Sequence, residues 1–150
     1  MLRDRSLFHE FVITDYTFDK DRIFARQTLS GDELHLYESL YSIMSQQTPL
    51  PDLVVFLRAS KERLMQHIAR RARSYELDMD PEYIAMLADA YDHYFFHYSK
   101  SPLLIINTAH IDFVQNPSEL EQLMRQIVSL RHPGTTHFNP QPSSKSTLAL

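Results

Sequence analysis

Three short apolar runs stand out along the chain and predict buried β-strands. They are "FVIT" at 11–14, "DLVVFL" at 52–57 and "LLIINT" at 103–108. Each run is continuous rather than alternating and is rich in β-branched residues, which is typical of strands covered on both faces in a parallel sheet. The pattern therefore predicts strands that pack in the middle of a domain.

Helical patterns fill the segments between these runs. Apolar residues recur at helical spacing over 32–47, after Ser60 in "SKERLMQHIARRA", and over 81–100. Ser60 is expected to cap the second of these helices, and Ser118 with Glu121 reads as a capping box for a last helix. Because strands and helices alternate, the sequence predicts an α/β domain with a parallel sheet and right-handed crossovers.

The periodic pattern stops at residue 132. The remaining segment, "HPGTTHFNPQPSSKSTLAL", is rich in Pro, Ser and Thr and predicts a disordered tail over 132–150. Residues 1–131 are then expected to form one folded portion. With 150 residues, of which 43% are hydrophobic, the chain is long enough for a single sizeable core.

Charge and composition narrow the classes of function. The formal net charge of −4 argues against a general nucleic-acid binder, which usually carries a basic excess. No run of about 18 apolar residues is present, and "MLRDRSLFHE" carries charges too early for a signal peptide, so no membrane partner is expected. The absence of cysteine fits a reducing compartment, and the cytoplasm is the predicted location.

An arginine-rich segment, "HIARRARSYE" at 67–76, is the strongest chemical signal. Arg70 and Arg73 share one helical face while Arg71 points elsewhere, so the three side chains are able to surround an anion at the helix end. Guanidinium groups match phosphate oxygens with a planar fork of donors. The alternative is a solvated helix end favoured by the helix dipole. Glu76 follows, and either accepts a sugar hydroxyl or neutralises Arg73.

Two further candidates follow predicted strands. Asp15, after "FVIT", has the placement of an acid that holds Mg²⁺ beside a phosphate chain, although a turn or cap residue is the alternative. Asp112 and Phe113, after "LLIINT", offer an edge and a face to a planar ring, against core packing of Phe113. In an α/β sheet, ligands bind beyond the carboxyl ends of the strands, where all these residues are expected.

The same sequence offers two other classes of function. His93 and His97 stand one helical turn apart, with Asp89 a further turn back, which is the spacing of a metal pair. The apolar stripe of that helix predicts instead that the histidines face outward. An all-helical binding module is the structural alternative, and the three β-branched runs argue against it.

The segment "PDLVVFLRASKERLMQHIARRARSYELDMDPEYIAMLADAYDHYF" with the following "SPLLIINTAHIDFV" resembles the C-terminal part of the deoxynucleoside kinases. The upstream "TDYTFDKDRIFARQTLSGDELHLYESLY" is similar to the bacterial branch of that family. The resemblance implies a partial P-loop-kinase-like three-layer fold. It also implies transfer of the γ-phosphate of ATP to the 5'-hydroxyl of a deoxynucleoside, with ATP and Mg²⁺ as cofactors.

The same resemblance implies roles for individual residues. Arg71 and Arg73 correspond to arginines that close over the donor phosphates, and Glu76 to the acid that binds the 3'-hydroxyl. The candidates for contact with the adenine of ATP are Ile111, Asp112 and Phe113. Asp15 falls near the acid that serves Mg²⁺ and the acceptor's 5' end.

Several features depart from the family pattern. Tyr16 stands where the motif after Asp15 has arginine, and His67 stands where relatives often have another arginine. The printed sequence has two glycines, Gly31 and Gly134, and no G-x-x-x-x-G-K-[ST] loop to cradle phosphates. We therefore expect either a fragment of a kinase, inactive as this chain alone, or a non-catalytic remnant that acts as a nucleotide-binding or interaction module.

The long helices carry surplus aromatic residues. Tyr94, Phe96 and Tyr98 lie close together in the helical pattern over 81–100. Surplus aromatic surface allows a homodimer, and packing of these residues in the core is the alternative.

Overall fold

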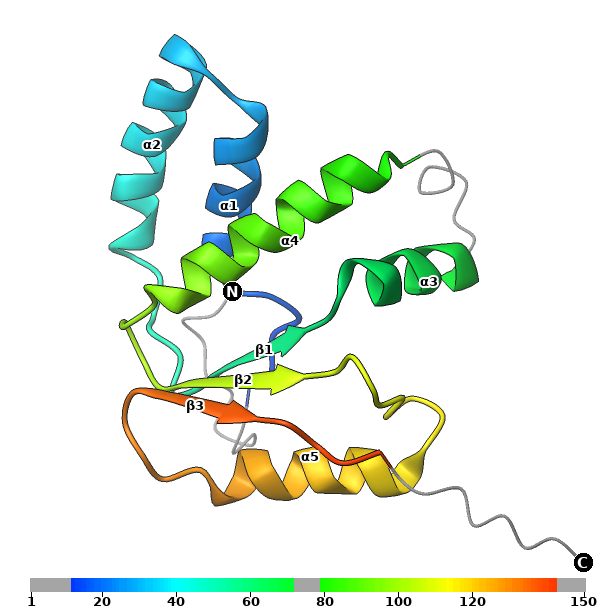
Figure 1. The fold of residues 1–150 in the computed structure, drawn as a ribbon. Coiled ribbons are helices and arrows are strands. Elements are labelled where there is room, and N and C mark those ends of the chain that lie inside the picture. Colours follow the sequence, from blue (N-terminus) through cyan, green and yellow to red (C-terminus); the bar gives the residue numbers. More distant parts are fainter. Residues whose placement is uncertain (1–11, 72–78, 143–150) are drawn as a thin grey trace, which may run out of the picture.

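The computed structural model describes residues 12–71 and 79–142 of the chain (Figure 1). The elements, in chain order, are α1 (Asp19–Thr28), α2 (Gly31–Ser45), β1 (Val54–Arg58), α3 (Lys61–Arg71), α4 (Pro81–Phe96), β2 (Leu103–Asn107), α5 (Pro117–Ser129) and β3 (Thr135–Phe138). None of these helices is long and apolar enough to cross a membrane.

The described strands form one parallel sheet in the order β1-β2-β3. Val54 of β1 lies opposite Leu103 of β2, which in turn lies opposite Thr135 of β3. Helices lie on both faces, with α4 on one and α5 on the other (Figure 1). The predicted α/β class with a parallel sheet is confirmed.

Alternation along β2 divides the core between the two faces. Leu103 and Ile105 pack with Phe95 of α4, whereas Leu104 and Ile106 pack with Leu123 of α5. Leu103, Leu104 and Ile106 are fully buried, and each such side chain contributes about 1.5–3 kcal/mol through the apolar surface it removes from water. The central strand is thus buried on both faces, as its continuous apolar run predicts.

The first predicted strand is absent where the structure describes it. Residues 12–14 of "FVIT" have no regular structure, and Val12 and Ile13 are 60% and 93% exposed; Phe11 lies outside the described residues. A strand forms only where a neighbour pairs with its backbone, and residues 12–14 do not join the described sheet. An apolar β-branched run is therefore not sufficient to define a strand.

The predicted tail contains a strand. Thr135–Phe138 form β3 and pair with the free edge of β2, so the expectation of disorder is wrong for these residues. The backbone rather than apolar burial favours this pairing, because β3 satisfies N–H and C=O groups of β2 that would otherwise stay unpaired. Gly134, with φ of 92°, makes the turn into the strand in a conformation that favours glycine. Residues 143–150 lie outside the described part.

The helices largely match their predicted positions, apart from the start of the last helix and the additional helix α1. Ser60 caps α3 as expected, since its Oγ accepts from the amide of Arg63 at 3.3 Å. The last helix begins earlier than the predicted capping box: Asn116 is the N-cap residue, and Glu121 pairs instead with Arg125 at 2.6 Å. The short helix α1 was not predicted.

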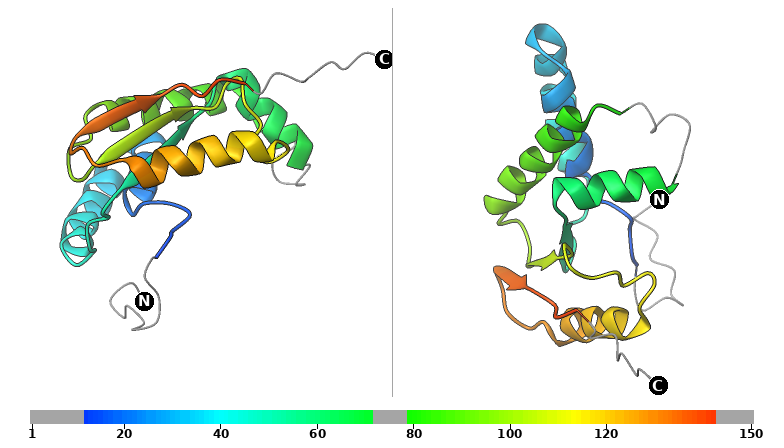
Figure 2. Two further views of the ribbon diagram at one scale, coloured as in Figure 1. Left: turned by 90° about the horizontal axis from the view of Figure 1, so that it is seen from below. Right: turned by 45° about the vertical axis from the view of Figure 1, so that its right-hand side comes forward.

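Helices α1 and α2 form an arm that projects from the rest of the protein (Figure 2). The arm is fixed at its base by Asp19, which is 7% exposed and accepts hydrogen bonds from the hydroxyl of Tyr41 and from Lys100 Nζ. Lys100 lies between α4 and β2, so this contact joins the arm to the body of the domain.

Candidate functional site

The carboxyl ends of β1 and β2 bring two functional segments together. Thr108 donates to the carbonyl of Arg58 from its amide at 2.8 Å and from its hydroxyl at 3.0 Å, so the two strands end side by side. Helix α3 follows β1 after two residues, and the β2–α5 loop (residues 108–116) follows β2. This edge of a parallel sheet is where ligands bind in α/β proteins.

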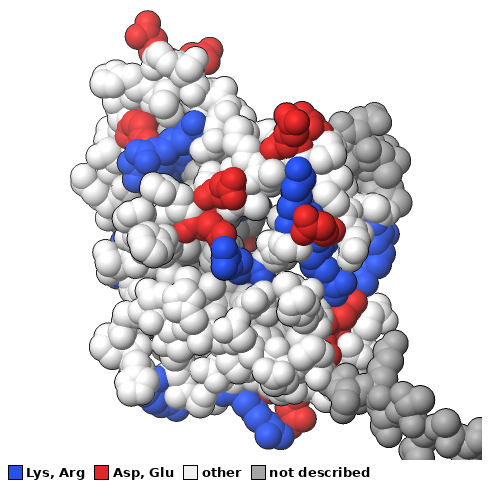
Figure 3. All heavy atoms as spheres, in the orientation of Figure 1, with Lys and Arg blue, Asp and Glu red and all other residues white. Residues whose placement is uncertain are grey.

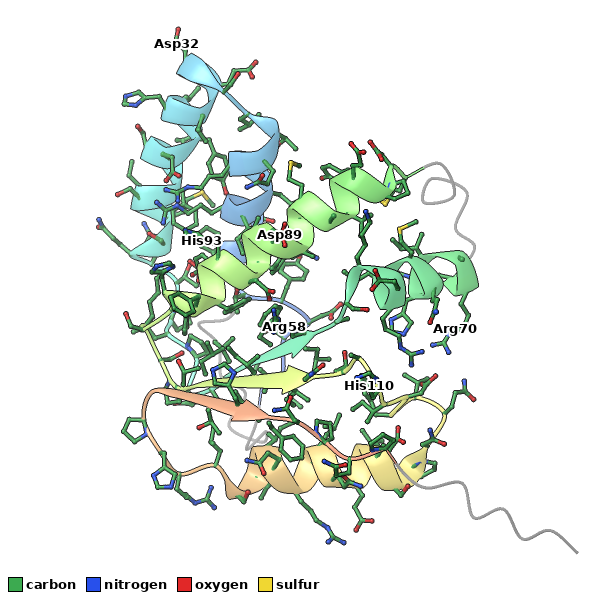
Figure 4. All side chains as sticks on the ribbon, viewed as in Figure 1. Asp32, Arg58, Arg70, Asp89, His93 and His110 are labelled. Atoms are coloured by element: carbon green, nitrogen blue, oxygen red, sulfur yellow. The ribbon has the colours of Figure 1, made fainter. Side chains whose placement is uncertain are left out.

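Two arginines of α3 hold the β2–α5 loop. Arg63 Nη2 donates to the carbonyl oxygen of Ile111 at 3.0 Å and lies 3.5 Å from Asp112 Oδ2. Arg70, two turns further along α3, donates from Nη1 to the same carboxylate oxygen at 3.2 Å. Figure 4 shows Arg70 on the side of α3 that faces the loop, and Figure 3 shows basic and acidic side chains gathered over this side of the protein.

The loop is also held from α5. Glu119, which is 2% exposed, accepts from the amide of Asp112 at 2.6 Å and from Asn116 Nδ2 at 3.3 Å. The other carboxylate oxygen of Asp112 accepts from the amide of Gln115 at 3.2 Å. The loop is therefore fixed by side chains of two helices as well as by its own backbone turns.

The Asp112 carboxylate is charged in this setting. Desolvation raises its pKa, but the hydrogen bonds from Gln115 and Arg70 and the charges of both arginines outweigh that effect. Its pKa consequently lies below the ordinary value for aspartate.

His67 lies on α3 between the two arginines in sequence. Partial burial lowers its pKa, and the charges of Arg63 and Arg70 lower it further, against an opposing effect of Asp112. The lowered pKa favours the neutral imidazole of His67 over its charged form.

The predicted phosphate-binding residues lie at or beyond the end of α3. Arg71 is the last residue of α3 and is exposed. Arg73 and Glu76 lie outside the described residues.

The predicted base-contact residues differ in what they expose. Ile111 is 3% exposed and belongs to the core, and its carbonyl oxygen accepts a hydrogen bond from Arg63. Phe113 is partly buried and packs against the same core, which agrees with the structural alternative considered for it. Asp112 is the one of the three whose polar atoms reach the surface of the site, with a side chain 24% exposed.

Asp15 lies in the irregular segment that leads into α1, with an exposed side chain. The neighbouring Tyr16 ring stacks under Lys20, with Nζ 4.6 Å from the ring centroid. Among residues 12–71 and 79–142, no group of three or more His, Asp or Glu side chains is arranged to hold a metal ion. A single carboxylate suits Mg²⁺ only when phosphate oxygens complete its shell.

The histidine pair of α4 is exposed, as predicted. The rings of His93 and His97 lie 4.6 Å apart, and His97 Nδ1 is 2.9 Å from the carbonyl oxygen of His93. Figure 4 shows His93 and Asp89 on α4, away from the loop that carries His110.

Sequence reasoning missed Arg63 and Glu119. Arg63 stands seven residues before Arg70, which is two helical turns and hence the same face, but it lies outside the arginine-rich segment. Glu119 is an acid in the first turn of a helix, where a favourable dipole interaction is the ordinary explanation. Neither pattern specifies the partner, which lies 48 residues away for Arg63 and seven residues upstream for Glu119.

Comparison with known proteins identifies the family. A family model described as "Deoxynucleoside kinase" matches residues 3–131, most of the chain. The chain belongs to the deoxynucleoside kinase family. It is 28% identical over 123 residues to a deoxyguanosine kinase of Bacillus subtilis, covering 79% of this chain and 59% of that protein. No solved structure matches the chain.

Two further relatives of the deoxynucleoside kinase family give the same picture. A deoxyadenosine kinase of Lactobacillus acidophilus is 28% identical over 129 residues, with 77% of this chain and 60% of the relative covered. A deoxyadenosine/deoxycytidine kinase of Bacillus subtilis is 24% identical over 129 residues, with 81% and 59% covered. The chain thus spans about three-fifths of the length of these relatives.

Proposed function

We propose that the chain forms the C-terminal part of an ATP-dependent deoxynucleoside kinase, which transfers the γ-phosphate of ATP to the 5'-hydroxyl of a deoxynucleoside. The observation that carries this proposal is the family match over residues 3–131. The side-by-side position of α3 and the β2–α5 loop supports it, because one segment offers arginines and the other a carboxylate and a ring. Such a pair suits the phosphates and the base of one nucleotide.

In this proposal different residues bind the phosphate donor and the nucleoside acceptor. Arg71 and Arg73 bind the donor phosphates and stabilise the charge that develops on the transferring group. Glu76 holds the 3'-hydroxyl of the acceptor, while Asp112 and Phe113 lie against the adenine and Ile111 packs in the adjoining core. Mg²⁺, when bound with ATP, neutralises phosphate charge, and Asp15 is the residue of this chain that we assign to it.

The printed chain has no glycine-rich phosphate loop, so we propose that it does not transfer phosphate by itself. Purified chain incubated with ATP, Mg²⁺ and each of the deoxynucleosides is expected to give no deoxynucleoside monophosphate. Formation of that product at a rate dependent on enzyme concentration would contradict the role we give to the missing loop.

In a complete kinase that contains this chain, Arg73→Ala is expected to lower the rate on the order of a hundredfold or more, because an electrostatic clamp on the phosphoryl group is lost. Arg125→Ala is the matched control, since Arg125 pairs with Glu121 on the exposed side of α5. The measurement is kcat and KM for ATP in both variants. A loss below about threefold for Arg73→Ala would remove that residue from the active site.

A non-catalytic nucleotide-binding or interaction module is the second candidate, and the absence of the glycine-rich loop favours it. It predicts binding of ATP by the purified chain with no transfer even when the remaining part of a kinase is supplied. Recovery of transfer under those conditions would rule it out.

We also propose a homodimer, with α2 rather than the predicted aromatic residues at its interface. Tyr98 is buried and Tyr94 packs against the core, which leaves Phe96 exposed. Helix α2 exposes an uncharged apolar stripe formed by Leu36, Leu40, Ile43 and Met44. A stripe on one helix is self-complementary in a two-fold pair. Light scattering is expected to give twice the chain mass of 17.7 kDa, and a monomer mass would contradict the proposal.

We place the protein in the cytoplasm, where its nucleotide substrates occur, and its lack of cysteine supports this location. Neither nucleic acid nor a membrane is proposed as a partner.

A further inference from the structure

Arg63 is the less exposed of the two α3 arginines that contact the β2–α5 loop. The side chain of Arg63 is 23% exposed, compared with 52% for Arg70. Its Nη2 atom reaches both the Ile111 carbonyl and the Asp112 carboxylate, and its Nε is buried without a hydrogen-bond partner. The guanidinium also donates from Nη1 to Gln66 Oε1 at 3.5 Å, so Nη2 is the atom that contacts the loop.

The contact between Arg63 and the Ile111 carbonyl oxygen restrains the backbone of the loop directly. A backbone carbonyl stays an acceptor at every pH and cannot rotate away as a side chain can. The Ile111 side chain packs in the core, and its carbonyl oxygen accepts a hydrogen bond from Arg63. The side chain and the backbone of Ile111 therefore both restrain the loop. Arg70 is half exposed and, among the described residues, contacts Asp112, so its ion pair is screened by solvent and contributes less.

We propose that Arg63 is a positioning residue that sets the β2–α5 loop for the nucleotide base and ties base binding to the helix that carries the phosphate-binding arginine. This inference rests on the proposed function. Arg63 and Arg71 belong to one helix, so any shift of α3 moves the base contacts and the phosphate contacts together. Arg63 itself need not touch the nucleotide.

The proposal predicts a selective effect on ligands. Loss of Arg63 is expected to weaken the binding of ATP, whose base lies against the loop, far more than the binding of inorganic tripolyphosphate, which has no base. A residue that acted only by its positive charge would weaken both ligands equally. Arg63→Lys separates the two effects, because it keeps the charge but replaces the planar guanidinium, whose Nη2 atom contacts both acceptors, with a compact ammonium group.

The first test measures amide hydrogen exchange by NMR in the 150-residue chain. In Arg63→Met, the amides of Asp112, Gln115 and Asn116 are expected to exchange at least about tenfold faster, because the contacts from α3 no longer restrain local opening of the loop. The amide of Ile105 in β2 and the control variant Arg125→Met should keep their rates. Unchanged exchange in the loop of a folded Arg63→Met variant would overturn the inference.

The second test measures dissociation constants for ATP and for tripolyphosphate. Arg63→Met is expected to weaken ATP by about tenfold and tripolyphosphate by less than about threefold, since a charge-assisted contact is lost only for the base side. Arg63→Lys should recover the tripolyphosphate value fully and the ATP value in part. Full recovery of ATP binding by lysine would show that charge alone matters and would overturn the positioning role.

The two tests also separate this inference from the proposed function. If wild-type chain binds ATP no better than tripolyphosphate, the loop does not contact a base, and the inference fails while phosphate binding stands. If it binds neither ligand, the proposed nucleotide site fails and the base role of the loop fails with it. In that case faster exchange in Arg63→Met would still assign Arg63 to the loop's structure.

Discussion

Two aspartates that each bind basic side chains do different work in this protein. Asp19, at the base of the α1–α2 arm, is 7% exposed and is bound by Tyr41 and Lys100. Asp112, at the carboxyl end of the sheet, is bound by Arg63 and Arg70 and keeps a side chain 24% exposed. The contacts of Asp19 join the α1–α2 arm to the rest of the fold, whereas the contacts of Asp112 fix the β2–α5 loop next to solvent.

The chemistry of the partners distinguishes Asp19, which serves the fold, from Asp112, which lies in the candidate site. At Asp19, burial raises the pKa, but hydrogen bonds from Lys100 and Tyr41 leave it below its ordinary value. Burial and the same carboxylate raise the pKa of Tyr41. The Asp19 carboxylate and the Tyr41 hydroxyl are thus engaged in contacts inside the protein. At Asp112 the carboxylate and its partner Arg70 stay in contact with solvent, with side chains 24% and 52% exposed.

The largest effect is expected from Asp19→Ala. Removing one partner of a buried ionic contact leaves the Tyr41 hydroxyl and the Lys100 ammonium without their acceptor, which costs about 3 kcal/mol in the free energy of unfolding. The measurement is urea unfolding followed by circular dichroism. Asp112→Ala is the matched comparison and should lower stability less, because the Asp112 side chain is more exposed than that of Asp19 and its partner Arg70 stays hydrated. Equal losses of unfolding free energy in the two variants would contradict this distinction between Asp19 and Asp112.

A smaller effect is expected from pH. Asp19 has a lowered pKa in the folded state, so its stabilising contribution is present above the unfolded value of about 3.9 and is lost as the pH falls through the folded value. Wild-type stability should therefore fall more steeply than that of Asp19→Asn below about pH 4. Parallel pH profiles of unfolding for the two proteins would contradict this assignment.

Salt sharpens the same comparison. At about 1 M salt the screening length is near 3 Å, which weakens ion pairs that solvent reaches. The stability difference between wild type and Arg70→Gln is expected to vanish in about 1 M NaCl, whereas the difference for Asp19→Ala should persist. A difference for Arg70→Gln that is insensitive to salt would show that its contact with Asp112 is shielded.

The smallest effect is a change in the titration of His67. The charges of Arg63 and Arg70 help to lower its pKa, so Arg63→Met is expected to raise it. NMR titration of the ring protons measures this directly, with His110 in the loop and His137 in β3 as internal references. A pKa of His67 that is the same in both proteins would place Arg63 too far away to act on it.

The fold was predictable where one segment carries its own signal. The runs at β1 and β2 are apolar enough to predict their burial, and Ser60 marks the start of α3. "FVIT" carries the same signal and forms no strand at residues 12–14, because pairing depends on a neighbour that the run does not specify. Conversely β3, with alternating exposure and few apolar residues, exists because β2 offers a free edge.

The candidate site was predictable to a similar extent. The arginine-rich end of α3 and the loop after β2 both carry a signal in the sequence, but their direct contact does not. Arg63 and Glu119 act on a loop through contacts set by tertiary packing, which no local spacing encodes. Arg73 and Glu76, which lie outside the described residues, stay predictions.

The most direct test of the account is an NMR titration of the 150-residue chain with ATP. The account predicts that ATP shifts the backbone amide signals of residues 110–114 and of the last turn of α3, and leaves those of the α1–α2 arm unchanged. Shifts confined to the arm, or no shifts at millimolar ATP, would contradict the claim that α3 and the β2–α5 loop together form one side of a nucleotide site.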